Sequence, residues 1–234
     1  MLTIVYRISD AGNLKEKLAG NDAIRCLENC LSVFGKDSFL LLADHCRTET
    51  LNAIRKLGIE PIETKLGNAL SWRHAAQLAL SKSGPDDHLY FVEDDYLHLP
   101  QARTVLLEGL AISDYVSLYD HPDKYQPGVN PYVQDGGETG KILLTQSCHW
   151  KTTNSTTMTF AVKARTLNED MPVWLESTAH GFPNDFEAFQ RLCGIGSWEN
   201  QIFGKGRRLI TPIPGFATHT ESAWLSPLQN WTQV

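Results

Sequence analysis

Three consecutive carboxylates, Glu93, Asp94 and Asp95, directly follow the apolar run Leu89–Val92. Like charges at adjacent positions repel one another, and a divalent cation among them relieves that repulsion. Carboxylate oxygens are hard ligands that suit Mg²⁺ or Mn²⁺, and such ions in turn hold phosphate oxygens. The pattern predicts a metal-assisted site for a phosphate-containing substrate. A solvated acidic turn that closes a strand is the alternative.

The elements that must position these carboxylates follow from the hydrophobic periodicity of residues 1–100. Apolar runs predict strands, and apolar residues at helical spacing predict helices between them. This alternation favours an α/β fold with a doubly wound, mostly parallel sheet and helices on both faces, in which ligands gather beyond the carboxyl ends of the strands. The strands are expected at 2–7, 38–43, 59–63 and 88–93, and the helices at 21–35, 48–57 and 68–82.

The second half of the chain has a different pattern. A polar stretch at 121–140 contains Gly and Pro and is expected to be a mobile loop. Two β segments are expected around a polar turn, at 141–149 and 155–162. The remaining expected elements are helices at 101–112, 167–177 and 185–193 and strands at 115–119 and 208–213. No linker divides the sequence, so residues 1–234 are expected to form a single domain.

Composition narrows the classes of function. The 234 residues carry 21 Lys+Arg against 27 Asp+Glu, a formal net charge of -6, and neither sign forms a long block. This balance argues against nucleic-acid binding through a general basic surface. Apolar stretches such as Phe39–Ala43 are too short to cross a bilayer, and Met1–Asp10 lacks the pattern of a signal peptide. With five Cys in no repeating pattern, a cytoplasmic protein with reduced thiols is expected.

The strand followed by Glu93-Asp94-Asp95 resembles the Asp-X-Asp motif of nucleotide-sugar glycosyltransferases of the GT-A fold, in its Glu-Asp-Asp form. The resemblance implies that Asp95 binds the metal and that Glu93 and Asp94 contact the ribose or metal-bound water. It also implies a nucleotide-sugar-binding half at 1–100 and an acceptor-binding half with a smaller β region at 101–234.

Further positions carry the same resemblance to family-2-like members in the nucleotide-binding half. The first expected strand ends at Tyr6 and Arg7, where such enzymes begin their nucleotide pocket, and the second ends at Asp44, where an acidic residue recognises the base. Asn68 and Arg73 resemble the Asn and Arg that line the nucleotide, with Arg73 near the phosphates. A helix-surface role is the alternative for Arg73.

Two later positions complete the resemblance. Asp185 opens a predicted helix after Pro183-Asn184 and resembles the catalytic base, with Glu187 in reserve. The family often has an acidic residue where Asn184 stands, and a plain N-cap at Asn184 or Asp185 is the alternative. His219 resembles the late His that completes the metal shell. Its imidazole favours Mn²⁺ over Mg²⁺ as the cofactor.

The acceptor is expected to meet the second half of the chain. The segment 149–157 is rich in hydroxyl and amide groups, so Trp150, Asn154 and Ser155 are candidates for contacts with the donor sugar or the acceptor. A plain hairpin turn and a core Trp are the alternatives. The segment 120–125 is a further candidate for the rim of that site, with an ordinary turn as the alternative.

The resemblance implies transfer of a sugar from a UDP- or GDP-sugar to a glycan or another hydroxyl acceptor, with inversion by one base, although a retaining route stays open. Two alternatives remain. A sugar nucleotidyltransferase would have a Gly-rich, cationic loop after the first strand, whereas Ser9–Asn13 has one Gly and no cation. A non-catalytic carbohydrate-binding module would use the acidic triplet to hold a structural Ca²⁺.

Overall fold

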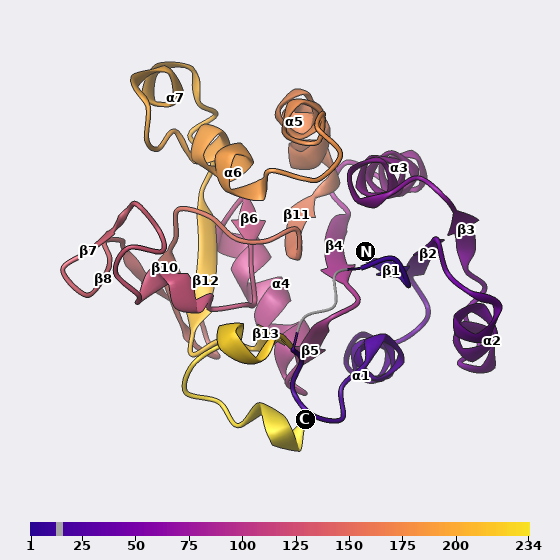
Figure 1. The fold of residues 1–234 in the computed structure, drawn as a ribbon. Helices are drawn as coiled ribbons and strands as arrows, with labels where there is room; N and C mark the ends of the chain where they lie inside the picture. The colour runs from indigo at the N-terminus through magenta and orange to yellow at the C-terminus, as the bar shows by residue number, and fades with distance from the viewer. Residues whose placement is uncertain (13–15) are drawn as a thin grey trace.

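The computed structural model describes residues 1–12 and 16–234, so Asn13 of the loop after the first strand lies outside the described residues. A nine-stranded sheet runs through the molecule in the order β3-β2-β1-β4-β11-β6-β12-β10-β9 (Figure 1). Helices cover both of its faces, which confirms the expected α/β class. No helix in these two ranges is long and apolar enough to span a membrane.

The N-terminal half has the alternating strands and helices that the sequence predicts. Its strands pair in parallel, with β1 between β2 and β4 and with β3 at the edge. The bounds are β1 Leu2–Ser9, α1 Ala23–Phe34, β2 Phe39–Asp44, α2 Thr48–Lys56, β3 Ile62–Thr64, α3 Asn68–Lys82 and β4 His88–Glu93. The expected boundaries lie close to these, because long apolar runs flanked by Gly, Pro and charged residues are strong signals.

The second half contributes the mixed part of the sheet. The strand β11 is antiparallel to both β4 and β6, β12 is parallel to β6, and β10 is antiparallel to β12 and β9. The bounds are α4 Ala102–Ile112, β6 Tyr115–Val116, β9 Ile142–Leu144, β10 His149–Thr152, β11 Phe160–Lys163, α5 Ala164–Ser177, α6 Asp185–Cys193, α7 Trp198–Phe203 and β12 Leu209–Ile213. The helix α7 had not been predicted.

The structure corrects the expected β segments and the expected loop. The hairpin is formed by β9 and β10, so its turn lies at 145–148, and the segment 153–159 is irregular but largely buried. The stretch 121–140 contains a short 3₁₀ helix, Pro122–Lys124, and a small antiparallel pair of β7 Val133–Gln134 with β8 Gly137–Glu138. The hydroxyl groups that suggested a turn at 153–157 are instead buried and hydrogen-bonded.

Two apolar cores flank the sheet. One side is packed by α1, α2 and α4, and the other by α3, α5 and α6. Trp72 and Trp174 are fully buried on the second side, with ring centroids 5.1 Å apart. The strands are therefore packed on both faces, and this packing fixes the backbone that carries the polar side chains at the strand ends.

Candidate functional site

The acidic triplet lies at the carboxyl edge of the parallel strands. In the register of the sheet, Arg7 is level with Glu93 and Ser9 is level with Asp44, so β1, β2 and β4 end together. A cavity of about 910 Å³ opens at this edge and is here called the strand-end cavity. Its lining includes Arg7, Ser9, Asp10, Gly12, Lys17, Asp44, His45, Arg47, Gly67, Asn68, Ser71, Glu93, Asp94, Asp95, Phe182 and His219.

Asp95 and His219 meet at one end of the strand-end cavity. The short strands β5, Tyr96–His98, and β13, Ala217–His219, pair antiparallel with His219 opposite Tyr96. Nε2 of His219 lies 3.0 Å from Oδ2 of Asp95. Burial lowers the pKa of His219, but the hydrogen bond and the charge of Asp95 outweigh it and raise that pKa above its ordinary value.

Glu93 is held by Arg7, which is itself buried. One Arg7 nitrogen donates to Oε1 of Glu93 at 2.9 Å, and another donates to the backbone and side-chain oxygens of Asn68 and to the hydroxyl of Ser71. Burial raises the pKa of Glu93 to about 7, although the charge of Arg7 acts against this shift. Arg7 therefore joins the ends of β1 and β4 to the start of α3.

Asp94 faces the loop after β1. Its Oδ2 accepts a hydrogen bond of 2.8 Å from the backbone N–H of Ser9. Burial and then the charge of Asp95 raise its pKa to about 6, with the Ser9 hydrogen bond opposing them. Each carboxylate of the triplet thus meets a different partner: Arg7, the Ser9 backbone and His219.

A divalent ion needs several oxygen or nitrogen ligands. In the part of the chain that the structure describes, no group of three or more His, Cys, Asp or Glu side chains could hold a metal ion. Asp95 and His219 lie 3.0 Å apart, and Mg²⁺ and Mn²⁺ are commonly held by one or two side chains plus substrate phosphate oxygens and water. These two side chains would hold an ion only together with the phosphate oxygens of a substrate.

Asp44 lines the strand-end cavity, yet its oxygens are used within the protein. They accept hydrogen bonds from the Thr64 hydroxyl at 2.8 Å and from the backbone N–H groups of Leu66 and Gly67 at 2.7 and 3.0 Å. Asp44 therefore fixes the loop before α3. Asn68 also lines the cavity, where its side chain accepts from Arg7.

Three side chains predicted to contact substrate point elsewhere. Tyr6 is fully buried in the core with its ring 5.7 Å from that of Phe39. Arg73 donates to the hydroxyl of Thr178 and to the carbonyl of Leu175, and so joins α3 to α5. Trp150 is fully buried in the core. Successive residues of a strand point to opposite faces of the sheet, and only residues three or four apart share a face of a helix; these three positions face the core or a neighbouring helix.

Asp185 begins α6 and faces the acidic triplet. Its charge acts on Glu93, and the charges of Lys124 and Asp123 act on Asp185 in turn. Burial raises the pKa of Asp185 to about 6, against the hydrogen bond from the backbone N–H of Phe186. A carboxylate with a pKa in this range suits a general base near neutral pH.

Asn184 and Glu187 form a reciprocal cap. The Asn184 side-chain oxygen accepts from the backbone N–H of Glu187, and its amide donates to the Glu187 carboxylate at 2.7 Å. Glu187 is exposed. The capping alternative therefore applies to Asn184 and Glu187, which leaves Asp185 as the half-buried carboxylate at this helix start.

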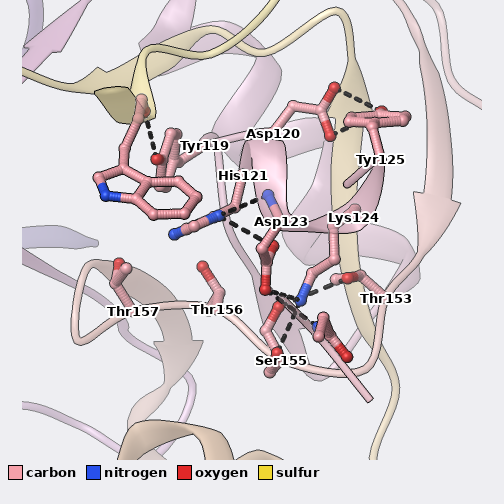
Figure 2. A network of polar contacts seen from close by, with 12 residues as sticks. Tyr119, Asp120, His121, Asp123, Lys124, Tyr125, Thr153, Ser155, Thr156 and Thr157 are labelled. Atoms are coloured by element: carbon pink, nitrogen blue, oxygen red, sulfur yellow. Dashed lines mark hydrogen bonds and ion pairs between the residues drawn. The ribbon is translucent and has the colours of Figure 1, made fainter. Parts of the chain in front are cut away.

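Asn154 and Ser155 belong to a buried polar network shown in part in Figure 2. Both accept hydrogen bonds from Nζ of Lys124, at 2.9 and 2.7 Å, and only 2% of the Lys124 side chain is exposed. Asn154 also donates from its backbone to Glu138 at 2.6 Å. The sequence predicted the polar character of this segment but not its buried cation, because a Lys in a Pro-containing turn normally faces solvent.

Comparisons with known proteins find similarity only to solved structures, and only at low sequence identity. No protein-family model and no curated protein sequence matches the chain. A solved CMP:2-keto-3-deoxy-manno-octonic acid synthetase complexed with CTP has 12% identity over 91% of this chain and 92% of its own, with a TM-score of 0.47.

Two other solved structures show the same low level of similarity. A nucleotidyl transferase from Methanothermobacter thermautotroptrophicus has 12% identity, coverage of 89% and 86%, and a TM-score of 0.44. The glucosyl-3-phosphoglycerate synthase from Mycobacterium tuberculosis, in complex with Mn²⁺ and UDP-glucose, has 13% identity, coverage of 69% and 56%, and a TM-score of 0.37. Similarity at this level carries no argument about the chemistry of this chain.

Proposed function

We propose that this chain is a metal-dependent glycosyltransferase that moves a sugar from a nucleotide-sugar donor to a hydroxyl group of an acceptor. The observation that carries the proposal is the meeting of Asp95 and His219, 3.0 Å apart, in the strand-end cavity, with the half-buried Asp185 near enough for its charge to act on Glu93. The Asp95–His219 pair would hold a metal-bound diphosphate, and Asp185 would accept a proton.

The donor would bind with its nucleotide in the strand-end cavity. The cavity is large enough for a nucleotide, at about 910 Å³, and extends from Asp44 and Gly67 to the Asp95–His219 pair. Phe182, which is 67% exposed, stands at the same cavity and offers an aromatic face. The diphosphate would then lie over Asp95, and the sugar would point toward Asp185.

The chemistry follows from these positions. A divalent ion held by Asp95 and His219, Mn²⁺ or Mg²⁺, would neutralise the charge that develops on the departing diphosphate. Asp185, ionised above a pKa of about 6, would accept the proton of the attacking acceptor hydroxyl. Glu93 and Asp94 would hold the ends of β1 and β4 in place through Arg7 and the Ser9 backbone. A single displacement with a single base inverts the anomeric centre.

A second candidate is a sugar nucleotidyltransferase, which joins a nucleoside triphosphate to a sugar phosphate. The observation that favours it is the pair of cations Lys17 and Arg47, which line the strand-end cavity and would meet a triphosphate. The stretch Ser9–Asn13 had argued against this activity, but Lys17 follows it in the same loop and Arg47 comes from the loop before α2.

One experiment separates these functions. The protein is incubated with Mn²⁺ and either radiolabelled UDP- and GDP-sugars or nucleoside triphosphates plus sugar phosphates and labelled pyrophosphate. Metal-dependent hydrolysis or transfer of the nucleotide sugar is the expected result. Pyrophosphate exchange with no turnover of nucleotide sugars would instead identify the nucleotidyltransferase. Binding of free glycans without either reaction would support the carbohydrate-binding module.

A further inference from the structure

A second group of polar side chains lies beside the strand-end cavity and takes no part in the chemistry proposed above. His121 and Asp123 are at its centre, in the segment that follows β6 (Figure 2). Nδ1 of His121 lies 2.9 Å from Oδ1 of Asp123 and 3.0 Å from the backbone N–H of Asp123. The backbone N–H of Asp123 donates to Nδ1, so Nδ1 is the acceptor nitrogen of the neutral ring and Nε2 carries the proton as a hydrogen-bond donor.

The orientation of the His121 ring is fixed on several sides. The ring packs between Tyr119, with centroids 4.9 Å apart, and Trp224, with centroids 5.3 Å apart. Asp123 is fixed in turn, because its other oxygen accepts from Nζ of Lys124 at 3.3 Å and from the amide of Asn130 at 3.0 Å. Burial raises the pKa of Asp123, but His121 and Lys124 outweigh it and lower that pKa to about 2.

His121 lies close to the proposed reaction centre. The ring of Tyr119 contacts that of Tyr96 at 5.6 Å, and the ring of Tyr96 contacts that of His219 at 5.3 Å. The Tyr96 hydroxyl also hydrogen-bonds Thr157 at 2.7 Å. In Figure 2 the outer ring nitrogen of His121 faces the side on which Thr156 and Thr157 lie.

Asp185 is coupled by charge to both regions. The charges of Asp123 and Lys124 act on Asp185, and the charge of Asp185 acts on Glu93. The His121 side chain is 22% exposed, so it can be reached by a ligand while its Asp123 partner is shielded.

The charges around His121 suit a neutral ligand. Lys124 is paired with Asp123, and Lys151 is paired with Asp120 at 3.0 Å and lies 4.0 Å from Glu138. Both lysines are buried and satisfied by these carboxylates and by neighbouring hydroxyl and amide groups. The group offers hydrogen-bonding atoms and aromatic edges but no surplus cation for a phosphate or carboxylate.

We propose that His121, oriented by Asp123, forms the acceptor-binding subsite and donates a hydrogen bond from Nε2 to a hydroxyl oxygen of a neutral polyhydroxylated acceptor. This inference rests on the proposed glycosyltransferase function and adds the residue that selects the acceptor. Asp185 receives the proton of the reacting hydroxyl, and His121 holds a hydroxyl of the same acceptor in place.

The test compares donor hydrolysis with transfer. His121→Phe removes Nε2 and keeps a ring between Tyr119 and Trp224, whereas His121→Gln supplies an amide N–H donor near the Nε2 position. The probes are a set of neutral methyl hexopyranosides and the corresponding hexose phosphates, with Mn²⁺ and the nucleotide sugar that the wild type hydrolyses. We expect His121→Phe to lower kcat/KM for the neutral acceptor about tenfold, through a higher KM, and to leave acceptor-free hydrolysis unchanged. His121→Gln should recover part of the loss.

His74→Phe, on the distant face of α3, is the matched control and should behave as the wild type. Asp123→Asn is the second variant, because it weakens the contacts with Lys124 and Asn130 that fix the residue beside the His121 ring, and it should reduce transfer without reducing hydrolysis. Full transfer by His121→Phe, an equal loss of hydrolysis and transfer, or a preference for the hexose phosphates would each overturn the proposal. Absence of any donor turnover by the wild type would instead overturn the proposed function on which it rests.

Discussion

Glu93, Asp94 and Asp95 carry the same charge but have different partners, and this difference separates their roles. Glu93 is bound to Arg7 and Asp94 to the backbone of Ser9, so both contribute to the shape of the site. Asp95 meets His219, whose imidazole is itself a metal ligand in many proteins. Of the three carboxylates, only Asp95 is therefore proposed as a ligand of the metal.

Replacing Asp95 by Ala should therefore abolish the metal-dependent part of nucleoside diphosphate binding. The ion loses a charged oxygen ligand, and His219 alone is a poor site for Mn²⁺. Isothermal titration calorimetry with UDP and GDP, with and without Mn²⁺, measures this effect. Asp37→Ala removes an exposed carboxylate far from the site and serves as the control. Equal Mn²⁺-dependent affinity in Asp95→Ala and the wild type would contradict the metal assignment.

Asp185→Asn should leave donor binding intact and reduce transfer by about 10²–10⁴, the usual contribution of a general base. Asn retains the oxygen that accepts from Phe186, so the helix start is preserved. In the wild type, a base must be deprotonated to act, so transfer should fall as the pH drops through about 6, the raised pKa of Asp185. The pH profile of kcat, measured from pH 5 to 8, would show this limb in the wild type.

Glu187→Gln is the matched control for that experiment, because Glu187 lies on the same helix but is exposed. Its substitution weakens the cap with Asn184 and should cost about 1 kcal/mol of stability or less. Transfer and its pH profile should stay as in the wild type. Loss of transfer in Glu187→Gln with full activity in Asp185→Asn would move the base to Glu187.

At the scale of the element, Arg7 joins three pieces of secondary structure. Its guanidinium ties β1 to β4 through Glu93 and to α3 through Asn68 and Ser71. Arg7→Met should lower the free energy of unfolding by about 3 kcal/mol, at the low end for a buried pair, because it leaves the half-buried Glu93 without its charge partner. Urea denaturation measures the change. Arg25→Met, in an exposed pair 4.0 Å from Glu28, should cost less than about 1 kcal/mol. Equal losses in the two variants would show that Arg7 has no special role.

The sequence predicted the parallel half of the fold well, because its strands are continuous apolar runs and its helices have clear stripes. The short strands β5 and β13 were missed, since three residues carry no periodicity and their pairing joins Tyr96 to the distant His219. The position of His219 beside Asp95 came from a family resemblance, not from any local pattern. The buried Lys124 gave no signal, because burial of a cation depends on partners far along the chain, such as Asn154 and Ser155.

At the scale of the whole molecule, the site is assembled from distant parts of the chain on one rigid sheet. The cavity is lined by the ends of β1, β2 and β4, by β13 near the C-terminus and by Phe182 before α6. A ligand that spans these parts contacts the parallel half of the sheet, the separate β5–β13 pair and the segment before α6 at once. Binding should therefore stabilise the fold as a unit, and not only the local loops.

This coupling predicts a joint effect of metal and nucleotide on the melting temperature. A ligand at 100 times its Kd stabilises the folded state by about 2.7 kcal/mol, which for a chain of this size raises Tm by roughly 5–10 °C. Because Asp95 and His219 supply only two ligands, Mn²⁺ and a nucleoside diphosphate should each have a small effect alone and a large one together. Differential scanning fluorimetry with both ligands, followed by EDTA, measures the shift and its reversal. If EDTA left the nucleotide-induced shift in Tm unchanged, the site would not contain a metal. If Asp95→Ala showed the same shift as the wild type, Asp95 would not be a metal ligand.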